Sequence, residues 1–123
     1  MDKLLKVFAE AMKELNINYD FMEWKTTPIP YPYFVGQYFT DNYINESGTT
    51  EGQLLLIGWD KNSSFKNLIE IDNKVKKYFS EYKKTLSNGS VAIHYVGSNS
   101  EYAENNDLKK IEIRLDFSLW EGE

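Results

Sequence analysis

The stretch KKIEIRLDFSLW, residues 109–120, decides the fold of this chain. Apolar and polar residues alternate along it, which is the pattern of a β-strand with one face in a core and the other in solvent. The residues expected to face the core are Ile111, Ile113, Leu115, Phe117 and Leu119. The residues expected on the other face are Glu112, Arg114, Asp116 and Ser118. Such a strand is typical of a mainly antiparallel sheet that is covered on one side.

Two amphipathic segments can supply that cover. The first has an apolar stripe made of Leu4, Leu5, Phe8, Met12 and Leu15, and the second has one made of Leu68, Ile71, Val75, Tyr78 or Phe79, and Tyr82. The first helix is expected to end near Asn16. The second is expected to be capped by Ser63 or Ser64, with Lys83 and Lys84 near its C-terminal dipole. Both helices are expected on one face of a mainly antiparallel sheet, because hairpins need only short links whereas parallel pairs need helical crossovers.

A β-hairpin is expected between the helices. The segments Tyr33–Asn45 and Gln53–Trp59 are rich in β-forming residues, and the polar residues 46–50 separate them. The run Leu54–Ile57 is apolar without alternation, which indicates a strand that is covered on both faces or contacts a neighbouring subunit. The short segment Tyr19–Lys25, before the hairpin, is expected to be extended.

After the second helix, the turn-forming pair Asn88-Gly89 introduces the last part of the sheet. Val91–Val96 is expected to be a strand, Gly97–Leu108 a polar loop, and Lys109–Trp120 the last strand. The expected order is therefore α-(β)-β-β-α-β-β, with the second helix as the one long crossover. This is a single α+β domain over residues 1–123, in which two helices cover one face of four to five mainly antiparallel strands.

Composition argues against several function classes. The chain has 123 residues and no cysteine, so its core must form without disulfides and no thiolate can bind a metal. The net charge of −5 and the single arginine, Arg114, argue against a nucleic-acid binder, which needs clustered positive charge. The N-terminus lacks the continuous apolar stretch of a signal peptide or membrane span, so we expect synthesis in the cytoplasm.

The residues predict no catalytic, cofactor-binding or metal site. His94, the only histidine, falls inside an expected strand, where a general base would need an oriented partner and a cleft. A structural role is the simpler interpretation. Glu101, Glu104 and Asp107 share an expected loop, which is better explained as a solvated loop than as a calcium site. The glycines do not form a phosphate-binding loop.

Aromatic residues make up 15% of the chain and crowd one region of it. That region contains Trp24, Tyr31, Tyr33, Phe34, Tyr38, Phe39, Tyr43 and Trp59. A domain of this size has difficulty burying so many rings, and large amphipathic rings are enriched at subunit interfaces. Two interpretations therefore stay open, which are a core alone and a core combined with an interface.

Three segments, taken in order, resemble phage tail terminator proteins. They are PIPYPYFVGQYF at residues 28–39, EGQLLLIGWDKNSS at residues 51–64 and KKIEIRLDFSLWE at residues 109–121. Together with a helix near the start and a second helix after the hairpin, they make the chain similar to tail-completion proteins of long-tailed bacteriophages over nearly its whole length. These are similarities of residue type and order, and they include no catalytic fingerprint.

The resemblance implies a non-enzymatic structural protein of a phage or prophage tail. Such a protein forms a homohexameric ring that ends tail-tube growth and joins the tail to the head. The implied partners are further copies of itself, the major tail tube protein, and head-tail connector or neck proteins. The resemblance implies no cofactor, no membrane and no specific nucleic acid, and it places the protein in the virion tail.

The residues expected at subunit or tube contacts are Trp24, Tyr31, Tyr33, Tyr38, Tyr43, Glu51, Trp59, Glu101, Tyr102 and Glu104. The segments Asn45–Gly52 and Gly97–Leu108 are expected to face the tube or the neck. Two other function classes stay open. A small cytoplasmic protein-binding module, such as a toxin-antitoxin partner, would have the same composition. An enzyme would need His94 brought together with Glu112 or Asp116 in a cleft.

Overall fold

Strand β6 (Leu108–Glu121) lies inside the sheet and has the predicted alternation. The computed structural model describes residues 2–24, 30–40, 48–102 and 108–121, and in it the five residues of β6 expected in the core are all buried. Strands β3 (Thr49–Lys61) and β5 (Gly89–Tyr102) pair with β6 on its two sides, and both pairings are antiparallel. The prediction made from this one stretch is therefore confirmed.

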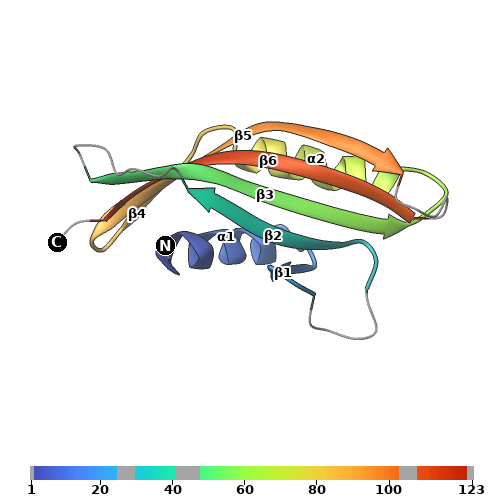
Figure 1. Cartoon of the computed structure of the whole chain (residues 1–123), viewed down its shortest axis with the longest axis horizontal. Coiled ribbons are helices and arrows are strands. Elements are labelled where there is room, and N and C mark those ends of the chain that lie inside the picture. The colour runs from blue at the N-terminus through green and yellow to red at the C-terminus, as the bar shows by residue number, and fades with distance from the viewer. Residues whose placement is uncertain (1, 25–29, 41–47, 103–107, 122–123) are drawn as a thin grey trace.

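The described residues form a six-stranded sheet in the order β1-β2-β3-β6-β5-β4 (Figure 1). Strand β2 (Tyr33–Thr40) forms the predicted hairpin with β3, and β1 (Tyr19–Phe21) lies beside β2 at one edge. Strand β4 (Tyr82–Leu86) forms the other edge. The β1-β2 pair is parallel and the other pairs are antiparallel, so the sheet is mixed. The α+β class is confirmed, but the sheet has more strands than the expected four to five.

Helices α1 (Asp2–Glu14) and α2 (Lys66–Tyr78) cover one face of this sheet and share one core with it. They also contact each other, because the Tyr78 hydroxyl donates a hydrogen bond of 2.5 Å to the Glu14 carboxylate. Helix α2 makes the predicted crossover, from β3 inside the sheet to β4 at its edge. All apolar stripes of the two helices and the sheet thus face a common interior.

The first helix ends where the sequence predicted. Asn16 has a positive φ of 61°, and its N–H donates to the Lys13 carbonyl at 3.1 Å. The Ile17 N–H donates to the Met12 carbonyl at 2.9 Å, which completes a Schellman motif. Asparagine tolerates the left-handed conformation better than other non-glycine residues, so this position stops the helix and turns the chain toward β1.

The prediction for the second helix was wrong at its C-terminal end. The helix ends at Tyr78, whereas Tyr82, Lys83 and Lys84 belong to strand β4. Strand β4 pairs with the beginning of β5 around the Asn88-Gly89 turn. The backbone groups of these residues therefore form hairpin hydrogen bonds, which a continued helix would not allow them to do.

The expected cap of the second helix was also wrong. Phe65 occupies the N-cap position, and it makes no side-chain cap hydrogen bond. Ser64 lies one residue before this N-cap, and its hydroxyl accepts a bond of 3.3 Å from the Lys66 N–H. The neighbouring Asn62 carboxamide oxygen accepts a bond of 3.2 Å from the Ser64 N–H. These local bonds form the polar turn between β3 and α2.

The two expected loops are partly strands. Strand β5 continues to Tyr102, with a β-bulge between Tyr95 and Gly97, so most of the described part of Gly97–Leu108 is paired with β6. Similarly, the segment Asn45–Gly52 enters β3 at Thr49. Residues 41–47 and 103–107 lie outside the described residues. Polar sequence misled the prediction here because these strand ends are exposed, and an exposed antiparallel strand needs no apolar alternation.

Two glycines in the sheet allow aromatic rings to lie against the backbone of a neighbouring strand. Phe34 is paired with Gly58, where an added Cβ would lie 2.1 Å from its ring. Tyr19 covers Gly36 in the same way, with its hydroxyl 2.5 Å from such a Cβ. Aromatic rings that cover cross-strand glycines fill the space left by the missing side chains. The rings therefore fix the register of β1, β2 and β3.

Candidate binding face

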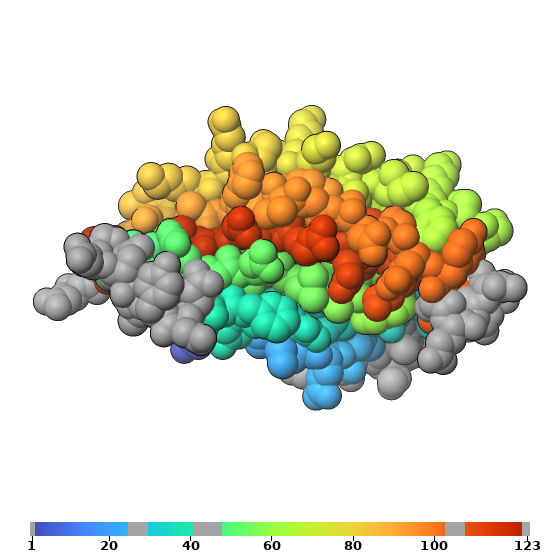
Figure 2. Space-filling model, turned by 45° about the horizontal axis from the view of Figure 1, so that its top comes forward, coloured from blue at the N-terminus to red at the C-terminus, as the bar shows by residue number. Residues whose placement is uncertain are grey.

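The sheet face opposite the two helices is not covered by either described helix, and we call it the open face. Its residues alternate with the core residues, and they are Tyr33, Val35, Gln37, Phe39, Glu51, Gln53, Leu55, Ile57, Trp59, Ala92, His94, Lys110, Glu112, Arg114, Asp116 and Ser118. In Figure 2, strands β6, β3 and β2 reach the surface side by side as red, green and cyan bands. The open face is therefore available to a partner.

The half of the open face on β2 and β3 is apolar. Val35 is paired with Ile57, and Gln37 is paired with Leu55. Leu55 and Ile57 are only half-buried, and Phe39 at the end of β2 is 56% exposed. The run Leu54–Ile57 was predicted to be covered on both faces or to contact a subunit, and here alternate members of the run face the core and the open face.

An aromatic stack lies at one end of this apolar half. The Tyr33 ring stacks on the Trp59 ring with centroids 5.1 Å apart. The Trp24 ring is tilted against Tyr33, with centroids 5.2 Å apart. The Tyr31 ring meets Tyr33 edge-on at 5.5 Å, and the Lys61 ammonium lies 5.7 Å from the centre of the Tyr31 ring. Burial, together with the neighbouring Tyr31, raises the pKa of Tyr33. Four of the predicted interface residues are thus brought together.

The other predicted interface residues are dispersed. Tyr38 points to the helix-covered side, where it stacks on Phe21 and packs against the core. Glu101 forms an ion pair of 3.4 Å with Lys110 across β5 and β6. Tyr102 lies at the far end of β5 and is largely exposed. Tyr43 and Glu104 lie outside the described residues.

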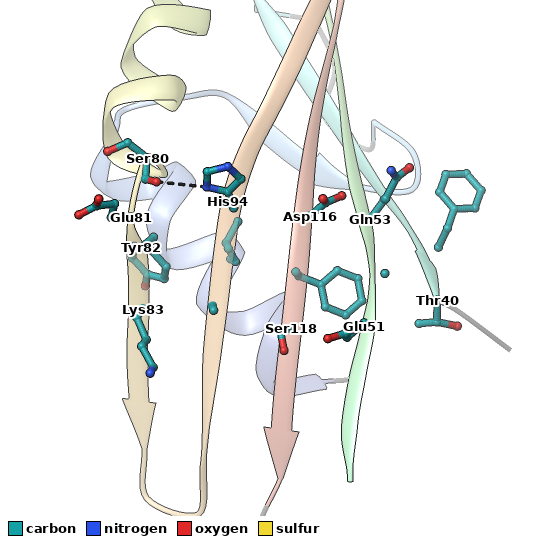
Figure 3. Close-up of a pocket in the computed structure, with 15 residues that line it drawn as sticks. Thr40, Glu51, Gln53, Ser80, Glu81, Tyr82, Lys83, His94, Asp116 and Ser118 are labelled. Atoms are coloured by element: carbon teal, nitrogen blue, oxygen red, sulfur yellow. Dashed lines mark hydrogen bonds between the residues drawn. The ribbon is translucent and has the colours of Figure 1, made fainter. Parts of the chain in front are cut away.

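A hollow of about 890 Å³ lies over the open face toward the end of β2 and the start of β3, and it reaches the β4 edge. One row of paired residues crosses it on four neighbouring strands, and this row consists of His94, Asp116, Gln53 and Phe39. In Figure 3, His94, Asp116 and Gln53 project from β5, β6 and β3. Glu51 and Ser118 form the next row. The neighbouring side chain at Ala92 is small, which leaves space above this part of the sheet.

The structure brings His94 and Asp116 together, which an enzymatic role would require. They are direct partners in the β5-β6 register, whereas Glu112 is paired with Asn99. The Nδ1–H of His94 donates to the Ser80 carbonyl at 3.2 Å, because a carbonyl oxygen can only accept. The neutral ring then has Nε2 available as an acceptor. Both side chains are exposed, so water competes with any proton transfer between them and a ligand.

The sequence analysis missed a buried polar pair at the other end of β3 and β6. Asp60 and Lys109 are 2% and 4% exposed and are direct partners in the register. The Asn67 carboxamide donates a bond of 3.1 Å to the Asp60 carboxylate, and the Lys109 ammonium lies 4.9 Å from the centre of the Tyr102 ring. The alternation itself places Lys109 in line with Ile111. That signal could have identified it as an inward-facing lysine.

Comparison with known proteins adds no assignment. No protein-family model matches the chain. No curated protein matches it significantly. Within the described residues, histidine, aspartate and glutamate side chains form no cluster of three that could hold a metal ion. The described helices are also too short and too polar to cross a membrane.

Proposed function

We propose that this protein is a non-enzymatic structural subunit of a phage or prophage tail, of the tail terminator type. In this role, several copies form a ring that ends growth of the tail tube and joins the tail to the head. The proposal starts from the resemblance of the three segments over residues 28–39, 51–64 and 109–121. The open face is the observation that carries it further.

The open face supports protein binding because several apolar side chains of its β2-β3 half keep exposed surface. Phe39 is mostly exposed, and Leu55 and Ile57 retain part of their surface, although the core on the other side of the sheet is already complete. Contiguous exposed apolar surface rimmed by polar groups marks protein interaction sites. The aromatic stack around Tyr33 and Trp59 adds rings of the kind enriched in interfaces.

The sheet edges support contact through faces more than through edge pairing. The β1 edge has three residues, and the five-residue β4 edge includes Lys83 and Lys84. Short and lysine-bearing edge strands oppose uncontrolled strand addition. A ring also needs two different surfaces on each subunit, because only a heterologous contact can be repeated around an axis. The open face and the helix-covered side provide two such surfaces.

The test is light scattering coupled to size exclusion, first on the protein alone and then with tubes of the major tail protein. A sixfold mass, or a stable ring formed only on tubes, supports the proposal. A monomer indifferent to tubes contradicts it and favours the alternative, a small protein-binding module such as a toxin-antitoxin partner. Neighbouring genes distinguish the tail role from the protein-binding module. Genes for a major tail protein and a tape-measure protein support the tail role.

The pairing of His94 with Asp116 favours a second candidate function, general-base catalysis in the hollow. In that reading Nε2 of His94 accepts the proton, and the Ser80 carbonyl fixes the ring through Nδ1. The exposure of both side chains supports the binding role over this one. Replacement of His94 by alanine tests this second function, because it removes the proposed general base and should abolish any catalysis.

A further inference from the structure

Helix α2 presents a basic stripe on its outward surface. Leu68, Val75 and the following Phe79 are buried, so the opposite side of the helix faces solvent. The exposed residues on that side are Lys66, Ile69, Glu70, Asn73, Lys74, Lys76 and Lys77, so the lysines outnumber the one carboxylate and the side is net positive. Ile69 is 48% exposed, which makes it an apolar residue within a stripe of lysines.

The hollow on the open face has the complementary character. The ionisable residues that line it are Glu51, Glu81, Asp116, Lys83 and His94, so with neutral histidine its lining is net negative. Within the described part of the chain, neither Glu51 nor Asp116 has an ion-pair partner. Exposed Phe39 stands at one end of the row that contains Asp116. The hollow therefore combines an apolar end with unpaired carboxylates.

The spacing of the two surfaces also agrees. Ile69 and Lys76 are separated by seven residues, which is about 10 Å along a helix. Phe39 and Asp116 are separated by two strand spacings, because Gln53 lies between them in the row, and this is about 10 Å across a sheet. A helix that lies across the strands can thus place its isoleucine on the phenylalanine while its lysines reach the carboxylates.

We propose that the outward stripe of α2 in one copy binds in the hollow of the next copy. Ile69 packs on Phe39, and Lys76 and Lys77 pair with Asp116 and Glu51. This inference rests on the proposed ring, for which it names the subunit contact. The contact joins two different surfaces, so each copy uses its helix on one neighbour and its hollow on the other, as a closed ring requires.

The experiment uses two charge-reversed variants of the full chain. In the first, Lys76→Glu and Lys77→Glu make the stripe acidic, and in the second, Glu51→Lys and Asp116→Lys make the hollow basic. Each variant alone then places like charges in the contact, and we expect ring formation to weaken on the order of tenfold or more. An equimolar mixture restores complementary charge at every contact of an alternating ring, so we expect it to recover the wild-type mass.

The control variant carries Lys6→Glu and Lys13→Glu on α1, which changes the net charge as the first variant does but outside the proposed contact. It should form rings as the wild type does, and circular dichroism should show all variants folded. Light scattering, with tail tubes added if the wild type needs them, gives the ring mass.

Each outcome decides the inference. Rings that tolerate both charge reversals overturn the inference and leave the proposed function standing. Rings that are lost and do not recover in the mixture also overturn it, because these residues would then contact another partner such as the tube. If the wild type forms no ring alone or on tubes, the proposed function fails, and the contact between copies fails with it.

Discussion

The two faces of the sheet are built from the same strands but differ in what their apolar residues do. On the covered face, Phe34 and Leu56 are fully buried under the helices and hold the fold together. On the open face, Phe39 and Leu55 keep exposed surface in the same two strands. The comparison teaches that similar side chains serve stability on one face and association on the other. Substitutions on the two faces should therefore separate these effects.

The largest effect on the free energy of unfolding is expected from Phe34→Ala. The ring is fully buried against Gly58, so its loss leaves a cavity and should lower the free energy of unfolding by about 3–5 kcal/mol. Urea denaturation followed by circular dichroism measures this change. A loss below about 1 kcal/mol, the size typical of a surface substitution, would contradict the assignment of the covered face as the core.

The buried pair provides the next largest effect, because it is the polar exception within the covered face. Lys109→Met removes the ammonium that lies 4.9 Å from the centre of the Tyr102 ring, and we expect a loss of about 2 kcal/mol in the free energy of unfolding. Combining it with Asp60→Leu removes both charges and should recover part of that loss. Chemical denaturation of the single and double variants gives the values. If the losses of Lys109→Met and of Asp60→Leu, each measured alone, add up in the double variant, the two residues are not coupled.

A smaller effect on the free energy of unfolding is expected where Tyr78 of α2 meets Glu14 of α1. The hydrogen bond to Glu14 is the main cause that raises the pKa of Tyr78 to about 12, from an ordinary value of 10.0. The folded state thus holds this proton more tightly, so the contribution is complete below pH 10 and is lost as the pH rises toward 12. Tyr78→Phe should cost about 1 kcal/mol at neutral pH.

The pH dependence checks that prediction. Between pH 10 and pH 12 the stability difference between wild type and Tyr78→Phe should shrink. Thermal unfolding at a series of alkaline pH values measures it, and the comparison with the variant removes the contributions of the other tyrosines. A difference that stays constant to pH 12 would mean that the tyrosine proton is not held by Glu14.

The smallest effects on stability are expected on the open face. Phe39→Ala should change the free energy of unfolding by less than about 0.5 kcal/mol, since the ring is mostly exposed, yet it should weaken ring formation. Unfolding and light scattering of the same samples test both. Loss of stability in Phe39→Ala without loss of association would reverse the distinction between the faces.

The sequence was most informative where local chemistry decides the structure, as in a strand with one face in the core and the other in water. Ile111 to Leu119 predicted the covered face of β6, and Asn16 predicted the end of α1, because each depends on local chemistry. The prediction was wrong for Tyr82, Lys83 and Lys84, because the tyrosine also fits a helical stripe and the lysines suit a helix C-terminus. The hairpin with β5 decided that segment, and such pairing comes from a distant strand.

For the candidate site, the sequence singled out the aromatic residues but not their arrangement. It placed Tyr38 with Tyr33, whereas the pleat of β2 sends them to opposite sides of the sheet. It also treated His94 as an isolated residue in a strand. The register between β5 and β6 set it opposite Asp116, and no pattern in either segment specifies that register.

By itself, the sequence determined the α+β class, the covered face of β6, the end of α1 and the absence of thiol chemistry. These follow from periodicity and composition, which act within a few residues. Only the tertiary structure decided the order of strands, the buried pair of Asp60 and Lys109, and the hollow with its row of His94, Asp116 and Gln53. They depend on strand register and on which surface the helices leave uncovered, and both are settled by contacts between distant segments.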